Sequence, residues 1–251
     1  ARAAEAFGVM QVLSSVCQPD FELIAKECAA PKVYQFYAHG DEAQVFDIAA
    51  RAKDAGYLGL CLTVDTQVYS RRERDILKRY IPLSGSRVDE AAKPVASGLQ
   101  SSFSWPFIDR LKSRLGMPLL LKGIACAEDA ALAVEHGVDV VWVSNHGGRQ
   151  LDNGRGALDT LPEVVEAVGG RATIIVDGGV LRGTDVLKAL ALGADFVLIG
   201  RPFLYAAAVE GDEGVARAVD ILVAEIDRNI GLMGLCSLSE LRPEMVRRIA
   251  G

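Results

Sequence analysis

Short apolar runs rich in β-branched residues alternate with longer amphipathic stretches along this chain. The alternation is typical of repeated βα units, which place their strands in one parallel sheet. The centres of the runs, such as VVWV and TIIV, are almost purely apolar, as expected for strands covered on both faces. We predict strands at 9–14, 32–37, 58–63, 118–122, 138–144, 173–177 and 195–200, and helices at 20–29, 41–55, 105–115, 128–136, 161–168 and 184–192.

Polar residues follow directly after many of the predicted strands, and this decides between two topologies. In an α/β barrel all strand ends form one ring around one site, whereas a flat doubly wound sheet uses only the strands near its switch point. We therefore predict a single (β/α)8 TIM barrel over residues 1–251, which is a suitable length for one such domain. The barrel is expected to lack its first strand and N-terminal segment, with the strands near Val9 and Val197 flanking a gap.

One predicted connection is far longer than the others. The segment 66–104 contains the charged run RRERD (71–75) and then Pro82, Gly85, Pro94 and Gly98. A loop of this length inside a compact domain is usually functional or disordered. We expect it to be a lid over the mouth of the barrel, with the part between Gln67 and Gln100 the most mobile segment of the chain.

Charge and cysteine usage exclude several classes of function. The net charge of −6 and the lack of a long basic run argue against nucleic-acid binding. No CxxC pair and no Cys/His cluster occurs, so we predict reduced core cysteines and no metal site. The five cysteines are Cys17, Cys28, Cys61, Cys126 and Cys236. No run of about eighteen apolar residues is present to span a membrane, and a cytoplasmic location is expected.

Two glycine-containing strand ends predict a phosphate site. Asp177-Gly178-Gly179 ends one strand, and Gly200-Arg201 ends the next. Barrels commonly bind phosphate at their last two strands through backbone N–H groups and a helix N-terminus, and Arg201 adds a cation that can bind two oxygens. FMN, IMP and sugar phosphates all suit such a site.

The stretch VWVSNHGGRQLD (141–152) predicts the chemistry of the site. His146 is suited to take a proton near neutral pH, and the planar fork of Arg149 matches a carboxylate. Their proximity suggests proton removal at or beside a carbon that carries a carboxylate. Lys122 ends an apolar strand, where a lysine is costly unless it meets an anion. Asp65 is expected to orient His146, and Arg72 offers a second carboxylate contact.

Further residues complete this prediction. Gln35 and Tyr37 lie two apart on one strand, so both are expected to point into the ring. His39 and His136 are expected to be structural or solvated rather than catalytic.

The motifs that carry these residues resemble one family over essentially the whole chain. SNHGGRQLD is the most specific of them, and LSS (13–15), QFY (35–37), LTVDT (62–66), RRERD, LLLKG, DGG and IGRP support it in order. The chain is similar to the FMN-dependent α-hydroxy-acid oxidases and dehydrogenases, which act on lactate, glycolate or mandelate. The resemblance implies FMN-dependent oxidation of an L-2-hydroxy acid to the 2-oxo acid. It also implies O₂, a quinone or a cytochrome as acceptor, a homo-oligomer that is a tetramer, and peripheral membrane association if a quinone is used.

The resemblance implies a role for each matching residue. The catalytic residues would be His146 as base, Asp65 behind it and Lys122 beside the flavin N1. Tyr37, Arg72 and Arg149 would bind the substrate. FMN would be bound by Ser14, Gln35, Thr63, Lys122, Ser144, Asp177, Gly178, Gly179, Arg182, Gly200 and Arg201.

Three departures from the family pattern leave alternatives open. The arginine that usually follows DGG by two residues is replaced by Leu181, so either one cation is missing at the phosphate side or Arg182 substitutes for it from a different angle. Val16 stands where glycolate oxidase carries a pocket tryptophan, which reshapes the pocket. The family's first strand has no counterpart, so the chain alone is expected to bind FMN weakly and be nearly inactive. The alternatives are an inactive or partial barrel, or another phosphate-binding barrel such as type 2 isopentenyl diphosphate isomerase or IMP dehydrogenase.

Overall fold

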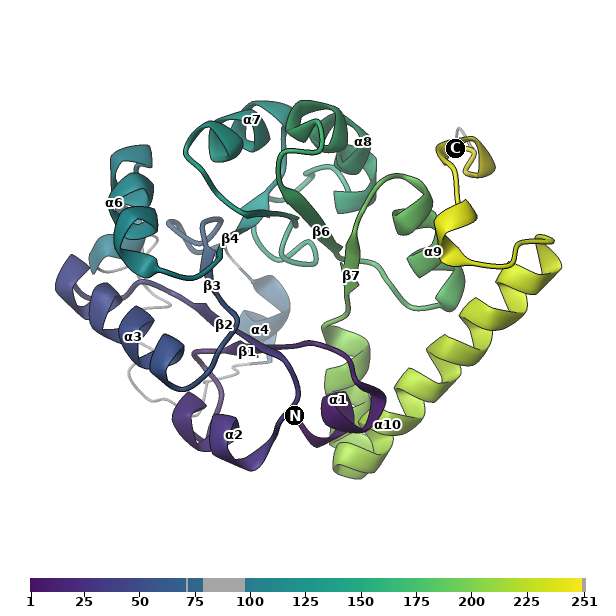
Figure 1. The fold of residues 1–251 in the computed structure, drawn as a ribbon, viewed down its shortest axis with the longest axis horizontal. Coiled ribbons are helices and arrows are strands. Elements are labelled where there is room, and N and C mark those ends of the chain that lie inside the picture. The colour runs from purple at the N-terminus through teal and green to yellow at the C-terminus, as the bar shows by residue number, and fades with distance from the viewer. Residues whose placement is uncertain (71, 79–97, 250–251) are drawn as a thin grey trace.

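The computed structural model describes residues 1–70, 72–78 and 98–249 and contains one curled parallel sheet (Figure 1). Its strands follow the order of the chain from β1 to β7, and each pairs with its sequence neighbour in parallel. They are β1 (Gln11–Ser14), β2 (Lys32–Phe36), β3 (Gly59–Thr63), β4 (Leu119–Ile124), β5 (Val140–Val143), β6 (Thr173–Asp177) and β7 (Phe196–Leu198). All seven predicted strands are confirmed, with ends that differ by up to two residues.

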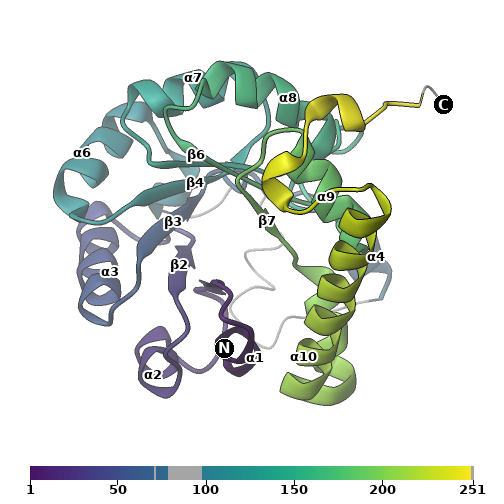
Figure 2. The same ribbon diagram turned by 45° about the vertical axis from the view of Figure 1, so that its right-hand side comes forward.

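The helices lie around the outside of the curled sheet in chain order, as two views of the ribbon show (Figures 1 and 2). They are α1 (Arg2–Phe7), α2 (Phe21–Glu27), α3 (Glu42–Asp54), α6 (Trp105–Leu115), α7 (Ala127–Glu135), α8 (Ala157–Val168), α9 (Gly183–Ala191) and α10 (Arg201–Leu232). The short α4 (Glu73–Leu77) lies in the long connection. Short 3-10 turns occupy η1 (Gly98–Ser101), η2 (Leu238–Glu240) and η3 (Pro243–Met245).

The strands separate two apolar layers because their side chains alternate between faces. Outward residues such as Leu60, Leu62 and Val141 pack under the helices and form the large core. Inward residues form a smaller cluster inside the curl, and every one is at most 5% exposed: Val33, Cys61, Leu120, Trp142 and Ile175. This arrangement explains why the strand centres are apolar on both faces.

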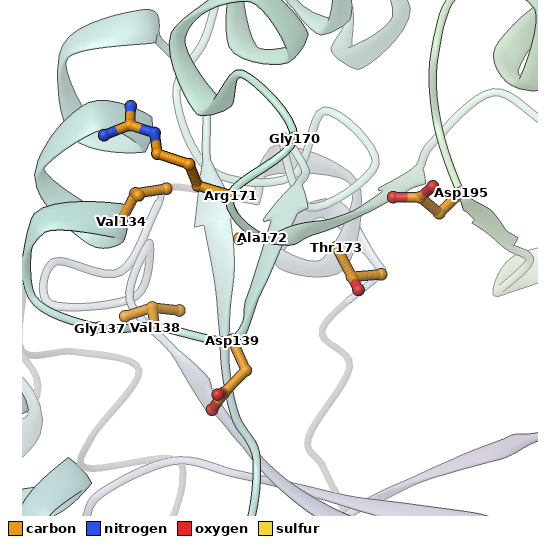
Figure 3. Close-up of a pocket in the computed structure, with 9 residues that line it drawn as sticks. All are labelled: Val134, Gly137, Val138, Asp139, Gly170, Arg171, Ala172, Thr173 and Asp195. Carbon is orange, nitrogen blue, oxygen red and sulfur yellow. The ribbon is translucent and has the colours of Figure 1, made fainter.

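Two aspartates fix the register at the N-terminal ends of neighbouring strands. The Asp139 carboxylate accepts the backbone N–H of Leu119 at 2.7 Å, and the Asp195 carboxylate accepts that of Ile174 at the same distance. Asp139 directly precedes β5 and bonds to the start of β4, and Asp195 directly precedes β7 and bonds to the start of β6. Figure 3 shows both residues around a pocket at this end of the sheet, remote from the strand ends where the predicted site lies.

The sheet does not close into a full ring within the described residues. β1 pairs only with β2 and β7 only with β6, so the predicted gap between the first and last strands is confirmed. The helical layer does close, because α1 packs against α10 and Arg2 forms an ion pair with Asp212 at 2.6 Å. The fold is therefore a TIM barrel that is open by one strand.

Three features differ from the predictions or fall outside them. The helix α10 was not predicted, and its glycines explain why, since non-helical backbone at Glu210 and Gly211 kinks it. The cysteines are all free, but Cys17 and Cys236 are exposed, so the prediction of five core cysteines is wrong for these two. Much of the predicted lid, including Arg71 and residues 79–97, lies outside the described residues.

Candidate active site

Polar side chains line the inner face of the sheet at the C-terminal ends of its strands. Five residues lie two positions beyond a member of the inner apolar cluster, so alternation places them on the same inner face. They are Gln35, Thr63, Lys122, Ser144 and Asp177. Ser14 pairs with Gln35 in the β1–β2 register and shares its face. The strands thus bring six of the predicted cofactor residues to one inner surface.

A charged network joins β4, β5 and β6 on this surface. The Lys122 ammonium donates to Ser144 Oγ at 3.2 Å and lies 3.7 Å from Asp177 Oδ2. The Ser144 hydroxyl donates to Asp177 Oδ1 at 2.7 Å. The side chains of Lys122 and Asp177 are only 13% and 17% exposed, so each charge compensates the other. An ammonium has three protons, and Lys122 therefore keeps the capacity to donate to a further acceptor.

The inner surface also holds a neutral pair and a buried thiol. The side-chain amide nitrogen of Gln35 donates to Thr63 Oγ1 at 2.7 Å. The side-chain oxygen Oε1 of Gln35 is the acceptor of the same amide group. Below Thr63, burial raises the pKa of the Cys61 thiol well above its ordinary value. Cys61 is therefore neutral at physiological pH, and the inner layer beneath the site is uncharged at this position.

His146 and Asp65 meet across the loops that follow β5 and β3. His146 Nδ1 lies 3.1 Å from Asp65 Oδ1 and 3.2 Å from Oδ2, and both side chains are less than one-fifth exposed. The backbone of His146 has a φ of 57°, and its N–H donates to Ser144 Oγ at 3.1 Å. A left-handed conformation is uncommon for a non-glycine residue. It turns the chain at the end of β5, and Ser144 connects this turn to the charged network.

The predicted substrate arginines lie where the long connection meets the loop after β5. Arg72 donates to Gln150 Oε1 at 3.3 Å, and the Ser70 hydroxyl donates to the backbone carbonyl of Arg149. Gln150 also donates to the carbonyls of Asp65, at 2.6 Å, and Val68, at 3.0 Å. Gln150 was not predicted as a site residue, although it lies inside the most specific motif.

Gln100 is a second residue that the sequence analysis missed. It is fully buried, accepts the backbone N–H of Ala38 at 2.8 Å, and donates to Thr63 O at 2.9 Å and Thr66 Oγ1 at 2.8 Å. These bonds anchor the end of the long connection beneath the loops after β2 and β3. Tyr37 follows β2 at this end of the sheet and is half-buried.

The predicted phosphate end lies at the tips of β6 and β7. Gly178 and Gly179 have φ angles of 99° and 75°, and Gly200 is the N-cap of α10 with no side-chain cap bond. Arg201 donates to the backbone carbonyl of Gly147 at 3.0 Å. Arg182 is instead engaged with Glu225, through its Nε at 2.8 Å, and its side chain is 70% exposed. The structure therefore places Arg201 against the loop that follows β5, whereas Arg182 is bonded to α10.

These residues fit a flavin mononucleotide. An added Cβ at Gly179 or Gly200 meets nothing within 4 Å, so both backbones border open space. Gly200 caps α10 without a side-chain bond, and a helix N-terminus of this kind binds phosphate well. The donor it offers is the N–H of Arg201, because Pro202 has no N–H and the N–H of Phe203 bonds to the Gly200 carbonyl. Hydrogen-bonding side chains line the inner surface between this end and β1, including the ammonium of Lys122. The surface thus offers backbone donors for a phosphate and polar side chains for a heteroaromatic ring.

His136 belongs to the outer helical layer and not to the candidate site. His136 ends α7, stacks on Trp105 with ring centroids 4.9 Å apart and lies 2.7 Å from Asp109, and these contacts agree with the expectation that it is structural or solvated. Within residues 1–70, 72–78 and 98–249, no group of three His, Cys, Asp or Glu side chains is placed to hold a metal ion. None of the helices in the described part of the chain has the length and apolar character to cross a membrane.

Comparisons with known proteins agree with this site. Residues 1–248 match the family described as FMN-dependent dehydrogenase. An L-lactate oxidase of Lysinibacillus sphaericus is 42% identical over 96% of this chain and 68% of its own length. Glycolate oxidase of Spinacia oleracea is 39% identical over 96% of this chain and 70% of its own length. A crystal structure of mandelate oxidase with (S)-2-phenylpropionate has a TM-score of 0.85 and 35% identity, covering 96% of this chain and 70% of that one.

The family match spans nearly the whole chain, and the relatives share more than a third of its residues. The open barrel and its polar inner surface agree with both. The chain therefore belongs to the FMN-dependent α-hydroxy-acid oxidase and dehydrogenase family, and it is an FMN-dependent 2-hydroxy-acid oxidoreductase.

Proposed function

We propose that this protein oxidises the L enantiomer of a small 2-hydroxy acid to the 2-oxo acid, with His146 as the base. The observation that carries the proposal is the contact of His146 with Asp65 at 3.1 Å, beside the loops that hold Arg72 and Arg149. A base next to paired cations is what proton removal from a hydroxy acid requires.

Substrate binding and proton transfer are assigned to different side chains. Arg149 and Arg72 bind the substrate carboxylate through planar forks, and Tyr37 contacts the substrate from the β2 side. These contacts fix the reacting carbon relative to His146. His146 takes one of the two protons that the hydroxy acid loses. Asp65 holds the imidazole in place and stabilises its charged form.

The proposed cofactor contacts follow the geometry of the inner surface. Ser14, Gln35 and Thr63 hydrogen-bond the flavin ring, and Lys122 neutralises negative charge that develops there. The ribityl and phosphate end would be held by Ser144, Asp177, Gly178, Gly179, Gly200 and Arg201, with Arg182 near this end at the N-cap of α9. FMN, when bound, would accept the two electrons and the second proton that leave the substrate.

We propose that the described parts of the predicted lid 66–104, which are residues 66–70, 72–78 and 98–104, border the site within a single domain of residues 1–251. Support comes from the bonds at the described ends of the segment. Ser70 and Arg72 bond to the loop after β5, and Gln100 donates to the carbonyl of Thr63, the last residue of β3. Both ends of the segment are therefore fixed at the C-terminal ends of the strands.

Substrate size, acceptor and assembly are further parts of the proposal. Val16, nearly half exposed just after β1, is expected to admit substrates as large as mandelate. O₂ is the expected acceptor because the relatives compared above are oxidases. A homo-oligomeric, cytoplasmic enzyme is expected by family resemblance.

The test combines flavin binding with reduction of the bound flavin. The purified chain is titrated with FMN, and the 450 nm band is followed without oxygen after addition of glycolate, L-lactate, L-mandelate or the D enantiomers. Bleaching by an L-2-hydroxy acid but not by its D enantiomer supports the proposal. A bound flavin that no 2-hydroxy acid bleaches contradicts the proposed catalysis, and a chain that binds no FMN favours the inactive or partial barrel.

A further inference from the structure

We propose that Gly123 is a positioning residue that holds Asp65 in contact with His146. The proposal rests on the function proposed above, since it assigns Gly123 to the support of the base. It starts from an irregularity in β4, which pairs with β3 on one side and β5 on the other. Asp65 follows β3, and His146 lies in the loop after β5.

Gly123 is the extra residue of a β-bulge. Lys122 pairs with Trp142 and Ile124 pairs with Val143, so Gly123 has no partner in the β4–β5 ladder. Its φ of 111° lies in the region that residues with a side chain rarely adopt. Bulges often occur next to active sites, where they redirect neighbouring side chains. Here the bulge follows Lys122, which faces the inner surface by alternation, and turns the next residue, Ile124, back to the outer core. The Ile124 carbonyl accepts the Ser144 N–H at 3.2 Å.

The missing side chain of Gly123 makes room for Asp65. A Cβ added at Gly123 would lie 2.7 Å from Asp65 Cβ, 2.8 Å from its Cγ and 3.0 Å from its backbone nitrogen. Ordinary contact begins at 3.4 Å, so Asp65 would have to move by several tenths of an ångström. The atoms involved include the backbone and the first atoms of a short side chain, which cannot swing aside as the end of a long side chain can.

A shift of Asp65 would be transmitted to the base. The carboxylate that would move is the one in contact with His146 Nδ1, and the Asp65 backbone carbonyl is bonded to Gln150. Both side chains of the His–Asp pair are largely buried, so the pair has little freedom to re-form elsewhere. Gly123 therefore acts on His146 through Asp65.

The chain offers a matched control and an internal reference. Gly56 also has a positive φ, 82°, but an added Cβ there meets nothing within 4 Å. Gly56→Ala therefore reproduces the backbone strain without the contact. Of the three histidines, His136 forms a second His–aspartate contact, 2.7 Å from Asp109, far from the inner surface.

The experiment follows the histidine ring nitrogens by NMR in the full chain labelled with ¹⁵N-histidine. His146 is assigned from His146→Ala. In Gly123→Ala, the Nδ1 signal of His146 is expected to shift while that of His136 stays in place, and Gly56→Ala should leave both unchanged. An unshifted His146 signal in Gly123→Ala overturns the proposal.

A second variant covers the case in which Gly123→Ala does not fold. Replacing Asp65 by Gly in the same chain removes the Cβ and Cγ that the new methyl group would meet. Recovery of folding in this double variant, measured by circular dichroism, supports the proposed contact. Continued failure to fold shows that Gly123 has another role and overturns the proposal.

Flavin reduction then tests the functional consequence in the chain with FMN bound. A misplacement of about 1 Å costs on the order of 10²-fold in rate. The smaller shift expected in Gly123→Ala should therefore slow reduction by up to about 10²-fold, with little change in KM. An unchanged rate despite a shifted His146 signal overturns the positioning role if His146→Ala does slow reduction. If His146→Ala is also fully active, the proposed function has failed, and the NMR result still reports the contact.

Discussion

Replacing Asp65 by Asn tests the support of the proposed base most directly. Asparagine keeps the shape of aspartate and one acceptor oxygen but removes the charge that faces His146 Nδ1 at 3.1 and 3.2 Å. We expect slower reduction of the bound flavin, because the positively charged imidazole that forms when His146 takes a proton loses its counter-charge. The KM should change little, since the proposed carboxylate contacts come from Arg149 and Arg72.

The size of the effect follows from the burial of the pair. The His146 and Asp65 side chains are 18% and 13% exposed, so solvent screens their interaction only weakly. A hydrogen bond to a charged group contributes about 1.5–3 kcal/mol. At about 1.4 kcal/mol for each factor of ten, the rate should fall by about 10- to 150-fold. The assay is single-turnover bleaching of the flavin by L-lactate or L-mandelate in a stopped-flow instrument without oxygen.

Asp109→Asn is the matched control. Asp109 contacts His136 at 2.7 Å, but its side chain is 54% exposed and lies on the outer helical layer. The control should reduce its flavin at the wild-type rate. A rate for Asp65→Asn within about twofold of Asp109→Asn would refute the role given to Asp65.

Three further changes test other parts of the site and fold. His146→Ala should slow flavin reduction by about 10²–10⁴-fold while FMN binding persists, and reduction within tenfold of wild type would remove His146 as the base. Arg149→Lys should raise KM strongly because an ammonium cannot make the paired contact, and unchanged kinetics would remove Arg149 from the substrate site. The bonds that Glu225 accepts from Arg182 and from the backbone N–H of Gly183 lower the pKa of its carboxyl. The stability that this lowered pKa provides is fully present when the pH is above the ordinary glutamate pKa of about 4.3. It is lost as the pH falls through the lower pKa of the folded state. Glu225→Gln should therefore lower Tm more at pH 7 than at low pH, and an equal Tm at pH 7 would contradict this reasoning.

The strands and most helices were predictable because their signals are local. Apolar runs of strand length, such as VVWV, and the glycines after helices give the positions of the βα units without any knowledge of tertiary contacts. The kinked helix α10 was harder, since Gly211 and Gly214 interrupt the pattern that marks a helix. An added Cβ at Gly214 would lie 2.3 Å from Ala206 O, so this glycine is required for packing across the kink.

The candidate site was predictable to the extent that its residues follow strands. Period-two alternation is enough to place Gln35, Thr63 and Lys122 on one surface. The hydrogen bonds of Gln150 and Gln100 join segments dozens of residues apart, and no spacing in the sequence encodes such bonds. The role of Gly123 depends on a bulge and on the position of Asp65, both of which are tertiary features. Arg182 has a partner on α10, an element that the sequence analysis did not predict.

The two aspartates at the opposite end of the sheet have a consequence for how this fold can change during evolution. Asp139 and Asp195 hold the starts of neighbouring strands through backbone N–H groups, so their bonds do not depend on which side chains the strands carry. Substitutions at the far ends of the same strands can then alter substrate preference without shifting the sheet. The spatial separation of these anchors from the chemistry reduces the usual conflict between acquiring a new activity and remaining folded.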